Sequence, residues 1–203
     1  MAETAFTAAE AAFVLREPVR QVKKALDAGP VQAKLVHKAG GAVRAVEWTD
    51  LVYLYAVRTL REELTPKARH AFYRALRNAP VEAAGEIRFG HLSIAIGEFT
   101  AELETRTHEL AALAEDVEFR ADGDPILKES GVEVHRIAAL LGGGMTPEEI
   151  REDYPSLTLA AISTAKAYAK AHPKPGRPYP GVSVKRALRG AGLEALDAVL
   201  DDE

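Results

Sequence analysis

The chain has 203 residues, no cysteine and a formal net charge of −4. Without cysteine it has neither disulfides nor a thiolate metal site, as expected of a protein of the reducing cytosol. The first residues lack the basic and then apolar pattern of a signal peptide, and no run approaches the ~18 apolar residues that a membrane span needs. We therefore expect a cytoplasmic protein without membrane contact.

The charge is unevenly distributed along the chain. Residues 1–78 carry 13 Lys and Arg against 8 Asp and Glu, a charge of +5, whereas residues 79–203 carry 13 against 22, a charge of −9. This asymmetry places any contact with nucleic acid in the N-terminal part. It also leaves the acidic remainder suited to a partner with a basic surface.

The basic part begins with two short helices. Thr7 and Glu10 have the spacing of a capping box, which predicts a helix from there to about Leu15. Pro18 is well placed at the start of a second helix, and Gly29 with the following proline ends it. Two short helices separated by a sharp turn are typical of a helix-turn-helix.

A hairpin and a third helix follow. Residues 31–37 and 43–48, joined by Gly40-Gly41, predict a β-hairpin that would serve as a wing. Thr49-Asp50 would cap a helix over residues 51–62. The order helix, helix, hairpin, helix predicts a winged helix-turn-helix.

Five basic residues of this part are candidate DNA contacts. We expect Arg20, Lys23 and Lys24 on the second helix to face the major groove, and Lys38 and Arg44 of the wing to contact phosphates. The alternative is that these side chains form only a solvated surface.

Phe6-Thr7-x-x-Glu10 and Trp48-Thr49-Asp50-Leu51 match landmarks of one family of regulators. In these two motifs the chain resembles the MerR-like winged helix-turn-helix proteins. It departs from them in the turn, where Arg16-Glu17 replaces the usual glycine. The resemblance implies a DNA-binding head.

Residues 79–116 predict a mixed linking layer and a possible dimerisation surface. Before it, Thr65-Pro66 begins a helix. Residues 86–99 have the β-branched and aromatic content of strands, and their alternation slips at Gly90-His91, which indicates a turn or bulge. Thr100 would cap a helix that ends near Glu115.

Three short helices are predicted after a last strand over residues 117–120. The first ends at Gly142, the second is capped by Thr146 with Glu149, and the third begins after Thr158. The apolar positions expected to pack them together are Val134, Ile137, Ala138 and Leu141 in the first helix and Leu159, Ile162, Ala165 and Ala169 in the third.

The same stretch contains Gly144-Met145-Thr146, Glu148-Glu149-Ile150, Asp153-Tyr154-Pro155 and Leu157-Thr158. In these motifs residues 117–172 resemble the VapB-type antitoxins of the domain of unknown function 433. The Thr-Arg usual after the glycine of their pattern is replaced here by Val132-Glu133. The resemblance implies an antitoxin that inhibits a PIN-type ribonuclease by contact with its acidic Mg²⁺ site.

The sequence contains no pattern of a catalytic or metal site. The six histidines never recur at a spacing of three or four residues, so no helical metal site is indicated. There is no nucleophile elbow, P-loop or dinucleotide-binding fingerprint. We expect no enzyme activity, no cofactor and no metal.

The C-terminal tail begins with a Pro/Gly-rich stretch over residues 172–181. Basic residues and apolar anchors follow it, a pattern that suits folding onto a partner. An arginine binds carboxylates in a bidentate way, so it would suit the metal site of the toxin. The predicted toxin-binding residues are Arg177, Arg186, Leu188, Arg189, Leu193 and Leu196. The alternative is a tail docked on the chain's own core.

Together these patterns predict a mainly α fold with small β elements, in which a winged helix-turn-helix head precedes a C-terminal trihelical, helix-turn-helix-like unit. The favoured function is the antitoxin and transcription repressor of a type II toxin–antitoxin system, a homodimer that binds operator DNA as paired half-sites. The alternatives are a stand-alone MerR-like regulator and a purely structural dimerisation protein. The predicted parts are a head (1–78), a linking layer (79–116), an antitoxin-family domain (117–172) and a tail (173–203).

Overall fold

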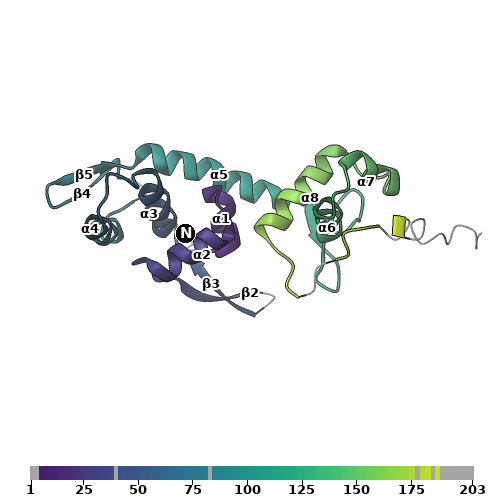
Figure 1. The fold of residues 1–203 in the computed structure, drawn as a ribbon, viewed down its shortest axis with the longest axis horizontal. Helices are drawn as coiled ribbons and strands as arrows, with labels where there is room; N and C mark the ends of the chain where they lie inside the picture. Colours follow the sequence, from purple (N-terminus) through teal and green to yellow (C-terminus); the bar gives the residue numbers. More distant parts are fainter. Residues whose placement is uncertain (1–4, 39–40, 82–83, 177–178, 184–185, 188–203) are drawn as a thin grey trace, which may run out of the picture. The chain divides into compact units, whose positions relative to one another are not determined.

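The computed structural model describes residues 5–38, 41–81, 84–176, 179–183 and 186–187 (Figure 1). The protein is mainly helical with small antiparallel sheets, which confirms the predicted fold class. By its internal contacts the chain divides within one long helix into unit 1, Met1–Ala112, and unit 2, Leu113–Glu203. No helix in the described part of the chain combines the length and the apolar character that crossing a bilayer requires.

Unit 1 begins with the predicted order of elements, two short helices, a hairpin and a third helix. Its sheet is antiparallel, with β3 between β1 and β2, so Phe6 and Thr7 are tied to the inner strand of the hairpin. The elements are β1 (Phe6–Thr7), α1 (Ala8–Leu15), α2 (Val19–Ala28), β2 (Lys34–Lys38), β3 (Gly41–Val46) and α3 (Trp48–Thr59).

The predicted limits of the first two helices are confirmed. The Thr7 side chain accepts a hydrogen bond from the Glu10 amide, and the Glu10 carboxylate accepts one from the Thr7 amide, so the capping box is complete. Pro18 is the N-cap of α2 and Gly29 its C-cap. Val22 and Leu26 are buried on the inner face of α2.

The prediction that Thr49-Asp50 caps the third helix is wrong. α3 begins at Trp48, and its N-cap is Glu47, whose backbone amide donates to Asp50 Oδ2 at 2.9 Å. Asp50 therefore closes a capping box from the third helical position. Glutamate is an uncommon N-cap, which is why the more typical Thr49 suggested a later start.

The rest of unit 1 comprises α4 (Pro66–Arg77), β4 (Glu86–Phe89), β5 (Leu92–Ala95) and α5 (Gly97–Glu115). β4 and β5 form the hairpin whose turn was predicted at Gly90-His91. α5 begins three residues before the predicted start at Thr100. The Thr100 hydroxyl donates to the Ile96 and Gly97 carbonyls inside the first turn, so this residue does not cap the helix.

The core of unit 1 joins the head to the hairpin that follows it. Phe72 and Leu76 of α4 are fully buried, as is Leu51 of α3. The Phe72 ring lies 5.5 Å from that of Phe89 in β4 and 6.1 Å from that of Tyr53 in α3. Helix α4 thus packs against α3 of the head and against β4 of the following hairpin. The core of unit 1 therefore crosses the domain boundary that the sequence suggested at residue 78.

Unit 2 consists of a short hairpin and three helices. Its elements are β6 (Val117–Phe119), β7 (Pro125–Leu127), α6 (Val134–Gly142), α7 (Pro147–Asp153) and α8 (Leu159–Ala171). β7 was not predicted and pairs antiparallel with β6. The predicted caps of α7 and α8 are confirmed, because the Thr146 and Thr158 side chains accept from the Glu149 and Ala161 amides.

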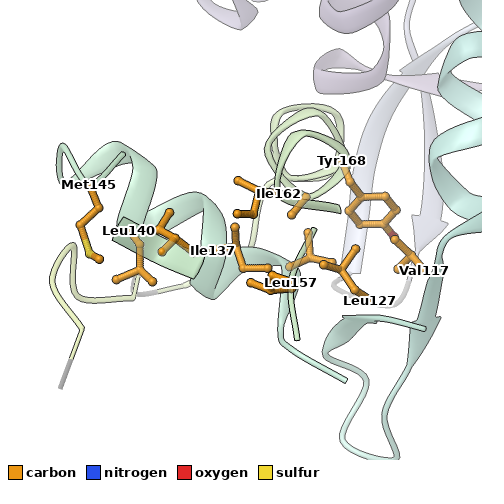
Figure 2. Packing of buried hydrophobic residues seen from close by; sticks show 11 residues of the cluster. Val117, Leu127, Ile137, Leu140, Met145, Leu157, Ile162 and Tyr168 are labelled. Atoms are coloured by element: carbon orange, nitrogen blue, oxygen red, sulfur yellow. The ribbon is translucent and has the colours of Figure 1, made fainter. Parts of the chain in front are cut away.

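One apolar cluster holds unit 2 together (Figure 2). Val134, Ile137 and Leu140 face it from α6, while Ile162 and Ala165 face it from α8. One expectation for the third helix was wrong, because Leu159 is 48% exposed. Ala169 is partly buried and packs against the cluster as expected, and Tyr168 is buried next to Val117.

Candidate functional site

The turn between α1 and α2 is tight and contains a left-handed residue. Arg16 has φ 53° and ψ 45°, a conformation that costs about 1–2 kcal/mol for a residue with a side chain. The Arg16 amide donates to the Phe13 carbonyl at 3.1 Å and the Glu17 amide to the Ala12 carbonyl at 2.9 Å, so backbone hydrogen bonds stabilise the strained residue.

Two arginines from distant helices hold the end of α1. Arg58 of α3 donates to the Leu15 carbonyl at 2.6 Å, and Arg106 of α5 donates to the Val14 carbonyl at 3.2 Å. Both guanidinium groups lie over the Tyr55 ring, at 5.1 and 5.4 Å from its centre. Because the last carbonyls of a helix have no partner within it, these bonds fix the point from which α2 departs.

The predicted DNA-contacting residues of α2 share one face. Arg20, Lys23 and Lys24 are exposed and line a single open hollow together with Asp27. None of the residues that the structure describes forms an ion pair with these three cations. The structure therefore brings them together as a patch of unneutralised positive charge, called here the α2 cation patch.

The wing is fixed to its surroundings by two ion pairs. Arg44 of β3 lies 2.6 Å from Asp27 of α2, and both side chains are about half exposed. Lys34 of β2 contacts Glu47, the N-cap of α3. Lys38 lies at the end of β2, and its side chain is outside the described part of the structure. Arg44 thus borders the α2 cation patch, but its charge is partly neutralised.

Behind the wing lies a polar network in the core of unit 1. Asp50 is 1% exposed and accepts from the Tyr73 hydroxyl at 2.8 Å. Burial, with the bond to Asp50, raises the pKa of Tyr73 to about 12. Hydrogen bonds from Lys34 and then from Arg77 lower the pKa of Glu47, against the opposing effect of burial. The Glu47 carboxylate is thus held ionised by groups from β2 and α4.

Arg186, one of the predicted toxin-binding arginines, has ion-pair partners within unit 2. Arg186 lies 2.9 Å from Glu149 and 3.5 Å from Glu152, and its Nε lies 3.7 Å from Asp153. These carboxylates belong to α7. Its guanidinium is thus surrounded by three acids of the same chain, and its side chain is 28% exposed.

The remaining predicted toxin-binding residues lie outside the described part of the chain: Arg177, Leu188, Arg189, Leu193 and Leu196. Over the described ranges, no group of three His, Asp or Glu side chains is arranged to hold a metal ion.

Comparison with known proteins bears on unit 2. The family model named "Protein of unknown function (DUF433)" matches residues 119–169. This stretch runs from the end of β6 into the last turn of α8, and it covers the motifs that carried the resemblance. The chain is also 28% identical over 187 residues to the uncharacterized protein y4eO of Sinorhizobium fredii, covering 84% of this chain and 82% of that protein.

The crystal structure of Rv2018 from Mycobacterium tuberculosis aligns with 79% of this chain and 96% of its own. The sequence identity is 16% and the TM-score 0.31, a value too low to establish a common fold.

Several residues that shape the site had no sequence signal. Arg58 and Arg106 looked like ordinary helix surface residues, since their carbonyl partners lie 43 and 92 positions away in sequence. The pair of Lys174 and Asp124 at 2.6 Å, which ties the start of the tail to the β6–β7 turn, is equally non-local. Only the Glu47–Asp50 capping box could have been found from local spacing.

Proposed function

We propose that the protein binds DNA through unit 1 and acts as the antitoxin and autorepressor of a type II toxin–antitoxin pair. The observation that carries the DNA-binding part is the α2 cation patch: Arg20, Lys23 and Lys24 are exposed on the second helix of a helix-turn-helix, and no described residue forms an ion pair with them. In such motifs this helix enters the major groove. The nearby wing would contact the phosphate backbone.

The local charge favours this face over the rest of unit 1. Residues 1–112 carry 15 Lys and Arg against 14 Asp and Glu, a charge of only +1. The attraction for a polyanion therefore depends on where the cations gather rather than on their total. On α2, three cations lie near a single acid, Asp27, and Asp27 forms an ion pair with Arg44.

The test measures the affinity of the full-length protein for DNA from upstream of its own reading frame, over a range of salt concentrations. Lys23→Ala or Lys24→Ala should weaken binding and lower the slope of log K against log salt by about one unit, since each removes one positive charge from the DNA-facing surface and so reduces the release of counterions. Arg20→Ala should instead relax the preference for one base by about 1–3 kcal/mol.

Lys67→Ala is the matched control, because Lys67 is an exposed lysine of α4 and carries the same charge. It should leave both affinity and salt slope unchanged. Equal losses for Lys67 and Lys23, or no salt-dependent binding by the unaltered protein, would remove the DNA-binding proposal. The saturated complex should contain two chains per operator by light scattering, as expected of a homodimer on paired half-sites.

The antitoxin part of the proposal is supported by the family match over residues 119–169 together with the motif resemblance. The partner would be a PIN-type ribonuclease, and the tail around Arg186 would carry the contact. An adjacent reading frame for a small nuclease that co-purifies with this chain is the expected finding. Without such a frame, the function would be that of a stand-alone transcription regulator.

A further inference from the structure

The described part of the tail runs back over unit 2. Lys174 pairs with Asp124 at 2.6 Å, and the Tyr179 hydroxyl donates to the same carboxylate at 3.1 Å. Lys174 also lies 4.6 Å from the centre of the Tyr179 ring. These contacts hold the beginning of the tail on the β6–β7 turn, so the following residues start from a fixed point.

The next residues lie against α6. Both terminal nitrogens of Arg136 donate at 3.3 Å, one to the Pro180 carbonyl and the other to the Val182 carbonyl. Backbone meets backbone where Gly181 approaches Gly143, the C-cap of α6. A Cβ atom placed on Gly143 would lie 1.9 Å from the Gly181 carbonyl oxygen, so a side chain there is incompatible with the observed path.

The last described residues of the tail dock on α7. Ser183 is 2% exposed, and its hydroxyl donates to Asp153. The Arg186 amide donates to Ser183 Oγ at 3.3 Å, and the Ala187 amide donates to the Ser183 carbonyl at 2.9 Å. These bonds hold Arg186 and Ala187 close to Ser183, where the Arg186 guanidinium contacts α7.

The docking site has a simple electrostatic basis. Glu149, Glu152 and Asp153 recur at a spacing of three and four residues, so they share one face of α7 and repel one another. Arg186 places a single cation within 4 Å of all three. A planar guanidinium offers five donors, which suits a site with several carboxylates better than an ammonium group does.

We propose that the described tail residues 180–183 and 186–187 dock on unit 2 in a closed state that holds Arg186 in a carboxylate site on α7 and keeps it from any partner until these contacts open. For a partner with an acidic surface, Arg186 has to exchange one set of carboxylates for another. The functional role of this opening rests on the antitoxin part of the proposed function. The closure itself depends only on contacts within this chain.

Hydrogen exchange of the full-length protein tests the closure without any partner. The amides of Arg186 and Ala187, which donate to Ser183, should exchange at least about tenfold more slowly than in an isolated peptide of the tail sequence, because exchange needs local opening. Gly143→Ala should raise their exchange about tenfold towards the peptide rate. Gly143 has φ −80°, which alanine adopts without strain, so α6 should stay folded.

Gly142→Ala is the matched control, since a Cβ atom at Gly142 meets nothing within 4 Å. It should leave exchange of the Arg186 and Ala187 amides as slow as in the unaltered protein. Exchange at the peptide rate in the unaltered protein, or equal effects of the two substitutions, would overturn the proposal. These exchange rates do not depend on whether the protein neutralises a nuclease or binds DNA. Each of the two proposals can therefore fail without the other.

Discussion

Two positively charged segments of the molecule differ in what surrounds them. On α2, three cations are exposed and unpaired among the described residues, while in the tail a single arginine is paired with three acids of α7. A count of basic residues would rank both as binding surfaces. The difference teaches that availability depends on neighbouring helices: α2 turns its cations away from the core, and α7 presents carboxylates to the tail.

The two units also differ in how they bury polar groups. In unit 1, Asp50 and Arg106 are inside the core, and each binds groups from a distant part of the chain. The core cluster of unit 2 is apolar, and its ionic contacts lie on its surface. Substitutions of ionised residues should therefore destabilise unit 1 most.

The largest effect is expected for Asp50→Ala. The substitution removes the partner of the Tyr73 hydroxyl and of the Glu47 amide at the start of α3. Losing a cap and leaving a buried donor unpaired should lower the unfolding free energy of unit 1 by about 3 kcal/mol. Trp48, the only tryptophan, reports on this unit, so urea denaturation followed by its fluorescence measures the loss.

Tyr73→Phe is the milder companion substitution. It removes the same Tyr73–Asp50 hydrogen bond but leaves the capping box intact, so the cost should be about 1 kcal/mol. Equal costs for the two variants would contradict the importance of Asp50 as a cap.

The second prediction compares two arginines that each pair with a glutamate. Arg106 is buried and also donates to the Val14 carbonyl, whereas the Arg88 side chain is 80% exposed and pairs with Glu86. Arg106→Ala should destabilise unit 1 by about 2 kcal/mol, because a carbonyl and a carboxylate lose their donor. Arg88→Ala should change stability by less than about 0.5 kcal/mol, as for most exposed ion pairs.

Both values come from urea denaturation with Trp48 fluorescence. If the substitutions cost the same, Arg106 does not hold the end of α1. A loss of DNA affinity in Arg106→Ala that exceeds its loss of folded protein would further indicate that this residue positions α2.

These cases also separate what the sequence could predict from what it could not. The caps at Thr7, Thr146 and Thr158 were predictable, because a cap depends on residues only three positions apart. Arg106 was not, since its carbonyl partner lies 92 positions away in sequence. The cations of α2 were predicted because helical spacing alone sets which face they share.

The tail illustrates the same limit. Its basic residues were visible in the sequence, but the sequence left open whether they bind a partner or the chain itself. The choice depends on the approach of Gly181 to Gly143 and on three acids of α7. Neither feature has a local signature, since both depend on how α6 and α7 pack.

The smallest predicted effect is a difference between the two units in how their stability depends on pH. Burial first, and then the charges of Lys174 and His172, lower the pKa of His135 in α6 below its ordinary value of 6.5, while Asp124 and Glu133 act in the opposite direction. Folded unit 2 therefore binds fewer protons than the unfolded chain just below pH 6.5. Its stability should fall as the pH drops through this range towards the lowered pKa.

The stability of unit 1 should not change in the same pH range through Tyr73 or Glu47, its groups with shifted pKa values. The raised pKa of Tyr73 costs stability only as the pH rises above 10, and the lowered pKa of Glu47 only as it falls below 4.5. Hydrogen exchange of core amides in the two units, corrected for the intrinsic rate at pH 7.0 and 5.5, measures both at once. His135→Gln should remove the acid response of unit 2, because glutamine does not titrate. A response that persists in this variant would assign it to another group, and a parallel response in unit 1 would show that the two cores do not differ in this respect.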